Sequence, residues 1–202
     1  MAEKVKELVP YFAYGANISP AKMRQRLSRM SLSCEPAQAI EDGVHLAFSH
    51  RGGFATLAKT EKQLSHLAGT DAHPVFQNPH GVLYQLSHQD LRVIAGHETG
   101  YKLSLMPVQT YQGHVVDANV FVSRPALALP RGLKPPLRYL ELLKSGAREQ
   151  GLSQEYQTWL ADLHWVANDQ LGPEYFATPS VLYTNVGMLT VILLLIAVVA
   201  LS

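Results

Sequence analysis

The segment from Tyr11 to Pro20 (YFAYGANISP) constrains the fold more than any other part of the chain. Residues Tyr11–Tyr14 are aromatic or small, as is typical of a buried strand. Gly15 permits backbone angles that other residues resist, Ser19 is a favourable helix N-cap, and Pro20 suits the first helical position. The segment therefore predicts a strand, a glycine turn and a helix start, a junction whose unpaired backbone N–H groups can hold a carboxylate or an oxyanion. On the local pattern alone, an ordinary connecting turn is the alternative.

The rest of the chain predicts a mixed α+β domain that is rich in strands. Strands are expected at 44–49, 54–57, 82–86, 103–109 and 115–123. Helices are expected at 22–30, 137–150 and 155–166. Ser87 and Asp90 approximate a capping box, which predicts one more helix start. The long polar stretch 58–80 is expected to be a solvated loop.

The composition of the chain says more about which partners it can bind than about which reaction it performs. The chain has 202 residues and a formal net charge of +1, so nothing in it suggests a nucleic-acid surface. Cys34 is the only cysteine, so no intrachain disulfide can form, which fits a reducing compartment. No histidine lies next to Cys34 in the sequence to mark it as a nucleophile. His66, His73 and His80 recur every seven residues and lack the closer ligand pairs of a metal site, so no metal is expected. The oligomeric state stays open, with a homodimer as one option.

The C-terminus is strongly apolar. No charged residue follows Glu174, and nearly every residue from 186 to 201 is apolar. With 181–185 included, the run reaches about the 20 residues that cross a bilayer. It predicts a single-pass membrane anchor with the folded domain on the cytosolic side, and a buried C-terminal helix or strand is the alternative. The predicted organisation is a leader at 1–10, a domain at 11–170, a linker at 171–180 and a transmembrane tail at 181–201.

Several short motifs carry a resemblance to a known family. The tetrapeptide at 14–17 (YGAN) resembles the YGSN signature of the γ-glutamylcyclotransferase family, which is also called AIG2-like. Further similar motifs follow in the family's order: GGFATL at 52–57, GVLYQL at 81–86, LRVIAGHETGY at 91–101, PPLRY at 135–139 and GAREQGL at 146–152. The resemblance covers roughly 11–163, with a poor fit at 58–80. It implies an α+β fold, a small mixed β-barrel-like domain with flanking helices.

The resemblance also implies roles for single residues. Glu98 matches the position of the family's catalytic acid/base glutamate. The implied substrate-binding residues are Tyr101, Tyr139 and the junction residues Tyr11, Phe12, Ala13, Tyr14, Gly15, Ala16 and Asn17. If the resemblance is set aside, the sequence predicts that Glu98 is a surface residue beside a turn and that Tyr101 and Tyr139 are aromatic residues packed in the core. Two residues depart from the pattern: Ala16 stands where serine is usual, and Phe121 stands where many members have tyrosine.

The reaction implied by the resemblance is an intramolecular cyclisation. The α-amino group of a small γ-glutamyl substrate attacks its own γ-carbonyl, which gives 5-oxoproline and a free amino acid or amine. One carboxylate can take the ammonium proton and later protonate the leaving nitrogen, and backbone N–H groups can hold the oxyanion. No cofactor is needed. Two alternatives stay open: a related cyclotransferase that acts on a γ-glutamylamine, and a non-catalytic small-molecule binding module with the same fold.

Overall fold

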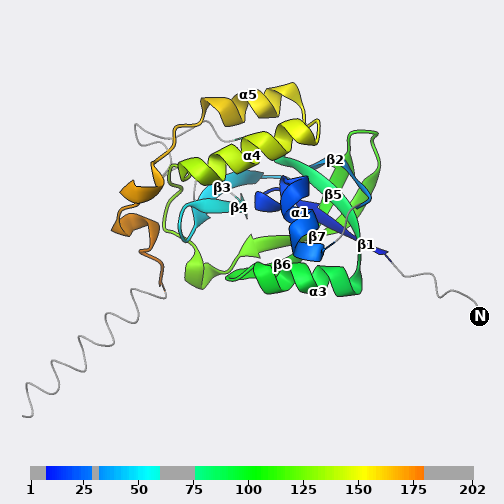
Figure 1. Cartoon of the computed structure of the whole chain (residues 1–202), viewed down its shortest axis with the longest axis horizontal. Helices are drawn as coiled ribbons and strands as arrows, with labels where there is room; N and C mark the ends of the chain where they lie inside the picture. Colours follow the sequence, from blue (N-terminus) through cyan, green and yellow to red (C-terminus); the bar gives the residue numbers. More distant parts are fainter. Residues whose placement is uncertain (1–7, 29–31, 60–75, 180–202) are drawn as a thin grey trace, which may run out of the picture.

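Residues 8–28, 32–59 and 76–179 are described by the structure, a computed structural model of the chain (Figure 1). The strands are β1 (Leu8–Ala13), β2 (Cys34–Ala39), β3 (Val44–His50), β4 (Phe54–Lys59), β5 (His80–Ser87), β6 (Tyr101–Thr110) and β7 (Val115–Ser123). The α-helices are α1 (Pro20–Leu27), α3 (His88–His97), α4 (Leu137–Glu149) and α5 (Gln154–Asp162). Short 3₁₀ turns occur at η1 (Ala16–Ile18), η2 (Pro125–Leu127), η3 (Asn168–Gln170) and η4 (Pro173–Tyr175).

Five strands form a closed barrel in the order β1-β5-β2-β6-β7, and β3 and β4 form a separate two-stranded sheet. β1 pairs antiparallel with β5 over its whole length, from Leu8 opposite Ser87 to Ala13 opposite Val82. The barrel closes where Tyr11 of β1 meets Asn119 of β7 in a parallel bridge. The Asn119 side chain reinforces this closure, because its Nδ2 donates to the carbonyl of Pro10 at 3.0 Å. Closure leaves these five strands without an unpaired edge.

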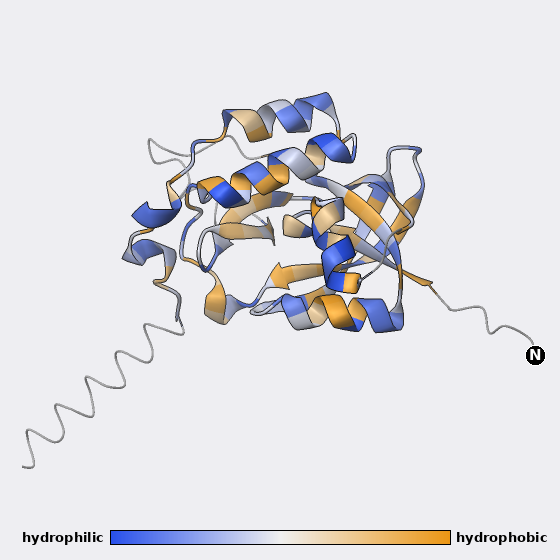
Figure 2. Cartoon of the chain, in the orientation of Figure 1, coloured by the Kyte–Doolittle hydropathy of each residue, from blue (hydrophilic) through white to orange (hydrophobic). Residues whose placement is uncertain are grey.

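The helices cover the barrel on opposite sides (Figure 1). α4 and α5 lie side by side over one side, while α3 lies against β5 and β1 on the other. Apolar and polar residues alternate along α4 (Figure 2), and its apolar residues Leu140, Leu143 and Ala147 are fully buried. This is the amphipathic pattern of a surface helix that packs on a core. η1 contacts both β1 and α4, and α1 packs against η1 and α3, so the junction of strand, turn and helix is held by elements from several parts of the domain.

The predicted α+β, barrel-like fold is confirmed in outline. All the predicted strands exist, and the Ser87–Asp90 capping box at the start of α3 is complete. β2 was not predicted, because its sequence CEPAQA lacks the β-branched and aromatic residues that favour strands. α5 ends at Asp162, four residues before its predicted end, because Val166 instead exchanges backbone hydrogen bonds with Pro135 and Leu137.

His80 corrects the prediction of a solvated loop at 58–80. It opens β5, is 9% exposed, and its ring stacks on Tyr156 with centroids 5.2 Å apart. Its Nδ1 shares a hydrogen bond with the Tyr111 hydroxyl. Burial lowers the pKa of His80 to about 4, so the ring is a neutral part of the core. The other two histidines of the sevenfold series, His66 and His73, lie outside the described residues.

The predicted membrane anchor also requires correction. Among residues 8–28, 32–59 and 76–179, no helix is long and apolar enough to cross a bilayer. The longest, α4, has 13 residues, whereas a span needs about 20, and one of its faces is polar. The tail at 181–201, on which the transmembrane helix was predicted, lies outside the described residues. The predictions of a fold with a C-terminal transmembrane helix and of a membrane location are therefore withdrawn, and the α+β domain is what the structure establishes.

Two glycines provide a matched test of the barrel packing. A Cβ atom at Gly81 in β5 would lie 2.3 Å from the Ala13 carbonyl oxygen, whereas one at Gly96 in α3 would meet nothing within 4 Å. We expect Gly81→Ala to lower the free energy of unfolding by about 1–3 kcal/mol, because the clash forces β1 and β5 apart. Gly96→Ala should raise it by up to about 1 kcal/mol, because alanine is the better helix former. Urea unfolding followed by circular dichroism measures both, and an unchanged midpoint for Gly81→Ala would contradict the β1–β5 packing.

Candidate active site

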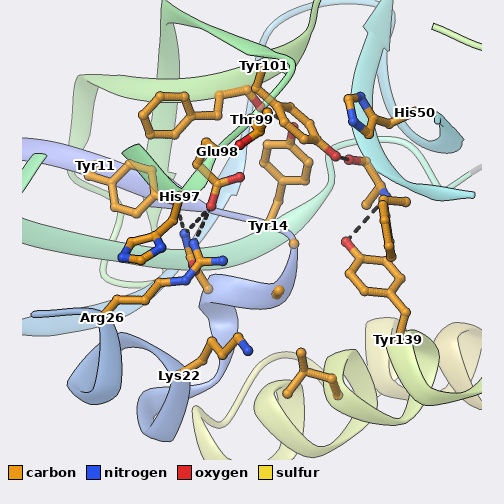
Figure 3. Close-up of a pocket in the computed structure, with 17 residues that line it drawn as sticks. Tyr11, Tyr14, Lys22, Arg26, His50, His97, Glu98, Thr99, Tyr101 and Tyr139 are labelled. Carbon is orange, nitrogen blue, oxygen red and sulfur yellow. Dashed lines mark hydrogen bonds and ion pairs between the residues drawn. The ribbon is translucent and has the colours of Figure 1, made fainter. Parts of the chain in front are cut away.

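A pocket of about 350 Å³ opens beside the end of the barrel (Figure 3). Its lining comes from β1 and the turn after it, from α1 and α4, from the start of β4, and from the end of α3 with the following β6. Eight of the predicted site residues line it: Tyr11, Tyr14, Gly15, Ala16, Asn17, Glu98, Tyr101 and Tyr139. The fold therefore brings together positions that are up to 128 residues apart in the chain, counted from Tyr11 to Tyr139.

Phe12 and Ala13 do not line this pocket. Phe12 is fully buried and Ala13 is 1% exposed, so both belong to the core. The Phe12 ring lies against Gly81 of β5, where an added Cβ would approach it to 2.9 Å. The two residues hold β1 in the barrel, and the neighbouring residues Tyr11 and Tyr14 face the pocket.

Glu98 lies at the C-terminus of α3 with its side chain in the pocket. Its backbone N–H donates to the Ala95 carbonyl at 3.2 Å as the helix ends. The carboxylate is 16% exposed and forms an ion pair with the Arg26 guanidinium. Its Oε1 also accepts a hydrogen bond from the Asn17 amide at 3.0 Å. A helix C-terminus repels a carboxylate, so these two donors supply the stabilisation that the helix dipole does not.

Asn17 connects Glu98 to the barrel. Its Nδ2 donates to Tyr11 Oη at 2.7 Å as well as to Glu98, and its backbone carbonyl accepts from the Tyr84 hydroxyl at 3.1 Å. The residue is 3% exposed. Its Oδ1 is buried and has no hydrogen-bond partner among the described residues. Asn17 therefore fixes the orientation of the carboxylate through a rigid, buried set of bonds.

The backbone of Ala55 holds two tyrosines at the opposite wall. Its N–H donates to Tyr139 Oη at 3.2 Å, and its carbonyl accepts from the Tyr101 hydroxyl at 2.9 Å. Burial raises the pKa of both phenols well above the ordinary value, and the nearby Glu98 charge acts in the same direction. Both tyrosines are therefore neutral near pH 7. Tyr139 accepts from Ala55, so it keeps its own hydroxyl hydrogen available for a ligand.

Tyr14 and Phe121 complete the aromatic wall. The Tyr14 hydroxyl donates to the Phe121 carbonyl, and burial raises the pKa of this phenol as well. The Phe121 ring meets Tyr11 edge-on with centroids 5.7 Å apart. Phe121 thus lies in the pocket at the position where many family members are expected to have tyrosine, so this chain lacks a hydroxyl there.

The turn at Gly15 approaches α4 closely. Gly15 has a φ of −107° and a ψ of −143°, outside the left-handed region. A Cβ at this position would lie 3.1 Å from Tyr139 Oη, so the glycine leaves room for the tyrosine hydroxyl. The carbonyls of Gly15 and Ala16 accept from Ile18 and Ser19 at 3.0 and 3.2 Å. Within the described part of the chain, the N–H groups of Ala16 and Asn17 meet no acceptor, as the predicted anion-holding turn requires.

Sequence reasoning missed several residues that line the pocket, among them the basic residues Lys22, Arg26, His50 and His97. Arg26 was missed because its partner Glu98 is 72 residues away, although a carboxylate at a helix C-terminus is itself a signal that a cation lies nearby. His50 of β3 was also missed. Its ring stacks on Tyr101 with centroids 4.1 Å apart, and its Nδ1 shares a 2.8 Å hydrogen bond with Ser123 Oγ. Burial, with a smaller contribution from Arg51, lowers the pKa of His50 to about 4.

Comparison with known proteins supports the resemblance to this family. The model of the AIG2-like family matches residues 79–160, which include α3, Glu98, Tyr101 and Tyr139. The match confirms the resemblance predicted from the short motifs. No curated protein matches the chain.

Solved structures extend the likeness of fold beyond this segment. A structure named gamma-glutamyl cyclotransferase is 22% identical with a TM-score of 0.62, and the match covers 82% of this chain and 92% of that one. An uncharacterized protein from Homo sapiens is 21% identical with a TM-score of 0.63 and the same coverage. YkqA from Bacillus subtilis is 17% identical with a TM-score of 0.57, covering 80% of this chain and 57% of that one. At these identities the three structures establish a shared fold.

Gly15→Val tests the close approach of the turn to Tyr139. The branched side chain should displace the Tyr139 hydroxyl and break its bond with the Ala55 N–H. We expect hydrogen exchange of the Ala55 amide to accelerate by about tenfold or more, because a bond of about 1–1.5 kcal/mol is lost. NMR measures the exchange, with Gly96→Ala as a control that should leave Ala55 unchanged. Full protection of Ala55 in a folded Gly15→Val protein would show that the turn is only a connector.

Proposed function

We propose that the protein is a γ-glutamylcyclotransferase, which cyclises the γ-glutamyl group of γ-glutamyl amino acids or amides to 5-oxoproline and releases the free amino acid or amine. The observation that carries the proposal is the position of Glu98. Its carboxylate is held in a pocket by Asn17 and Arg26, and it faces a turn with unpaired N–H groups. The match to the AIG2-like family and the shared fold support the same reaction class.

In the proposed mechanism, Glu98 transfers the protons. The substrate α-ammonium gives one proton to the Glu98 carboxylate, and the resulting amine attacks the γ-carbonyl carbon to form the new C–N bond. The carbonyl oxygen becomes an oxyanion. When the oxyanion collapses, the original C–N bond breaks, and the leaving nitrogen takes the proton from Glu98. The ring nitrogen still carries two hydrogens and a positive charge, so it gives one proton to the regained Glu98 carboxylate, which passes it to the released amine; the products are 5-oxoproline and an ammonium. The atoms and charges balance without a redox or group-carrying cofactor, and Glu98 returns to its ionised form.

The other pocket groups suit the charges of this substrate. The N–H groups of Ala16 and Asn17 would hold the glutamyl α-carboxylate, a contact that uses the backbone and survives the replacement of serine by Ala16. The free hydroxyl hydrogen of Tyr139 would donate to the γ-carbonyl oxygen as negative charge develops there. Arg26 pairs with the Glu98 carboxylate and helps to hold it at the position from which it would act as a base.

The pocket would also act on the shape of the substrate. A free γ-glutamyl chain samples many conformers, and few of them bring the amine against its own carbonyl. Tyr11, Tyr14, Tyr101 and Phe121 line the cavity with aromatic rings, and in the proposed mechanism these walls hold the substrate in a folded form. Selecting the cyclising conformer accounts for a large part of the acceleration in reactions of this kind.

Glu98→Gln tests the assignment of the acid/base. The amide keeps the shape of the side chain but cannot accept the proton, so we expect the rate of 5-oxoproline formation to fall about 10²- to 10⁴-fold. Binding of 5-oxoproline, measured by calorimetry, should stay within about tenfold, because the turn that holds its carboxylate is intact. The assay incubates the full chain with a panel of γ-glutamyl compounds and quantifies 5-oxoproline and the released amine by chromatography.

Glu149→Gln is the matched control for that experiment, since Glu149 lies on the exposed side of α4 and outside the pocket. It should retain full activity. A Glu98→Gln protein that keeps more than half of the wild-type rate would overturn the role of Glu98. A wild-type protein that binds the panel without forming 5-oxoproline would instead support the non-catalytic binding module.

A further inference from the structure

We infer that Lys22 is a specificity-determining residue that recognises a carboxylate on the leaving amine of the substrate. The preferred substrates would then be γ-glutamyl amides of amino acids or peptides, and uncharged γ-glutamylamines would be poor ones. The inference deepens the proposed function and rests on it. It starts from the balance of charges around the pocket.

The lining of the pocket is rich in cationic residues. Among the described residues that line it, Lys22, Arg26, His50 and His97 are basic and Glu98 is the one carboxylic acid, and the pKa of His50 is lowered to about 4 by burial, so this ring is neutral near pH 7. The ion pair with Glu98 neutralises Arg26. No ion pair joins the Lys22 ammonium to an acid within the described part of the chain. The empty pocket therefore keeps one unbalanced positive charge at Lys22, which favours an anionic ligand.

The position of Lys22 is fixed by α1. Lys22 and Arg26 are four residues apart, so their side chains leave the same face of the helix about one turn apart. Met23 and Leu27 anchor α1 to the core, and the Lys22 N–H bonds the capping hydroxyl of Ser19 at 3.4 Å. Figure 3 shows Lys22 and Arg26 extending from α1 to the same side of the pocket, with Arg26 at Glu98. Lys22 thus lies one helical turn from Arg26, the partner of Glu98, and lines the same pocket.

The chemistry of the substrate identifies which anion fits there. In the proposed mechanism, the glutamyl ammonium is assigned to Glu98 and the glutamyl carboxylate to the N–H groups of the turn. The leaving nitrogen sits on the carbonyl carbon that is attacked, close to Glu98. When this nitrogen belongs to an amino acid, its carboxylate is two bonds away. A carboxylate at that distance from the reaction centre can pair with Lys22 one turn from Arg26, whereas an uncharged amine cannot.

A pair of substrates isolates this interaction. γ-Glutamylalanine and γ-glutamylethylamide differ only by the carboxylate on the leaving amine. We expect Lys22→Met to lower kcat/KM about tenfold for γ-glutamylalanine, as for the loss of one charge-assisted hydrogen bond, and to change it less than twofold for γ-glutamylethylamide. The ratio between the substrates is insensitive to a general loss of folded protein. Arg24→Met is the control, because it removes the same charge from an exposed position of α1 outside the pocket, and both substrates should be unaffected.

The outcomes separate this inference from the proposed function. An equal loss for both substrates would overturn it, since Lys22 would then hold the glutamyl part or support the fold. An unchanged ratio with unchanged rates would overturn it as well. If the wild-type protein forms no 5-oxoproline from either compound, the proposed function fails. Calorimetric binding of the same two compounds then tests whether Lys22 recognises the carboxylate. A selective loss of γ-glutamylalanine affinity in Lys22→Met supports this role, and any other result overturns it.

Discussion

The carboxylate of Glu98, held at the end of a helix that repels it, is the constraint around which the pocket is arranged. Placing a largely buried negative charge at the C-terminus of α3 is unfavourable unless other groups compensate it. Arg26 and Asn17 provide that compensation from α1 and from the turn after β1. The same contacts join three segments that are distant in the chain. The contacts that orient the proposed catalytic group are therefore the same contacts that hold α1 against α3.

The wall opposite Glu98 is built mainly from backbone contacts. Ala55 offers one N–H and one carbonyl, and these two groups position the hydroxyls of Tyr139 and Tyr101. Buried phenols of raised pKa remain neutral, so they contribute hydrogen bonds and add no competing charge. Since both tyrosines are held before any ligand arrives, little reorganisation is needed on binding. In enzymes generally, preorganised hydrogen-bond donors of this sort are a main source of electrostatic stabilisation of the transition state.

Local patterns predicted much of this arrangement. The order of apolar segments predicted six of the seven strands, and the capping pair Ser87–Asp90 predicted the start of α3. The family resemblance, and not a local pattern, assigned the turn at 14–17 and Glu98 to one site, and residues of both line the pocket. Contacts between distant segments were not predictable in the same way: β2 forms because β5 and β6 offer it partners on both sides, although its own residues do not favour a strand. Likewise, no local feature of α1 marks Arg26 as the partner of Glu98.

Two further features show the limits of local patterns. At position 15 the sequence suggests a turn, but the close approach of Tyr139 from α4 to this glycine is a contact that only the tertiary fold reveals. The apolar C-terminus was assigned to a membrane from hydropathy alone, a measure that says how apolar a segment is and nothing of what covers it.

The most direct test of this account is a crystal structure of the protein soaked with 5-oxoproline, the proposed product. The account predicts that the carboxylate of 5-oxoproline lies within hydrogen-bond distance of the Ala16 and Asn17 N–H groups. The ring N–H should lie within about 3.2 Å of a Glu98 oxygen, the range of an ordinary N–H···O bond. The ring oxygen should face the Tyr139 hydroxyl. Binding of 5-oxoproline elsewhere, or in this pocket with Glu98 out of reach of the ring nitrogen, would contradict the role of Glu98 as the proton-transferring group.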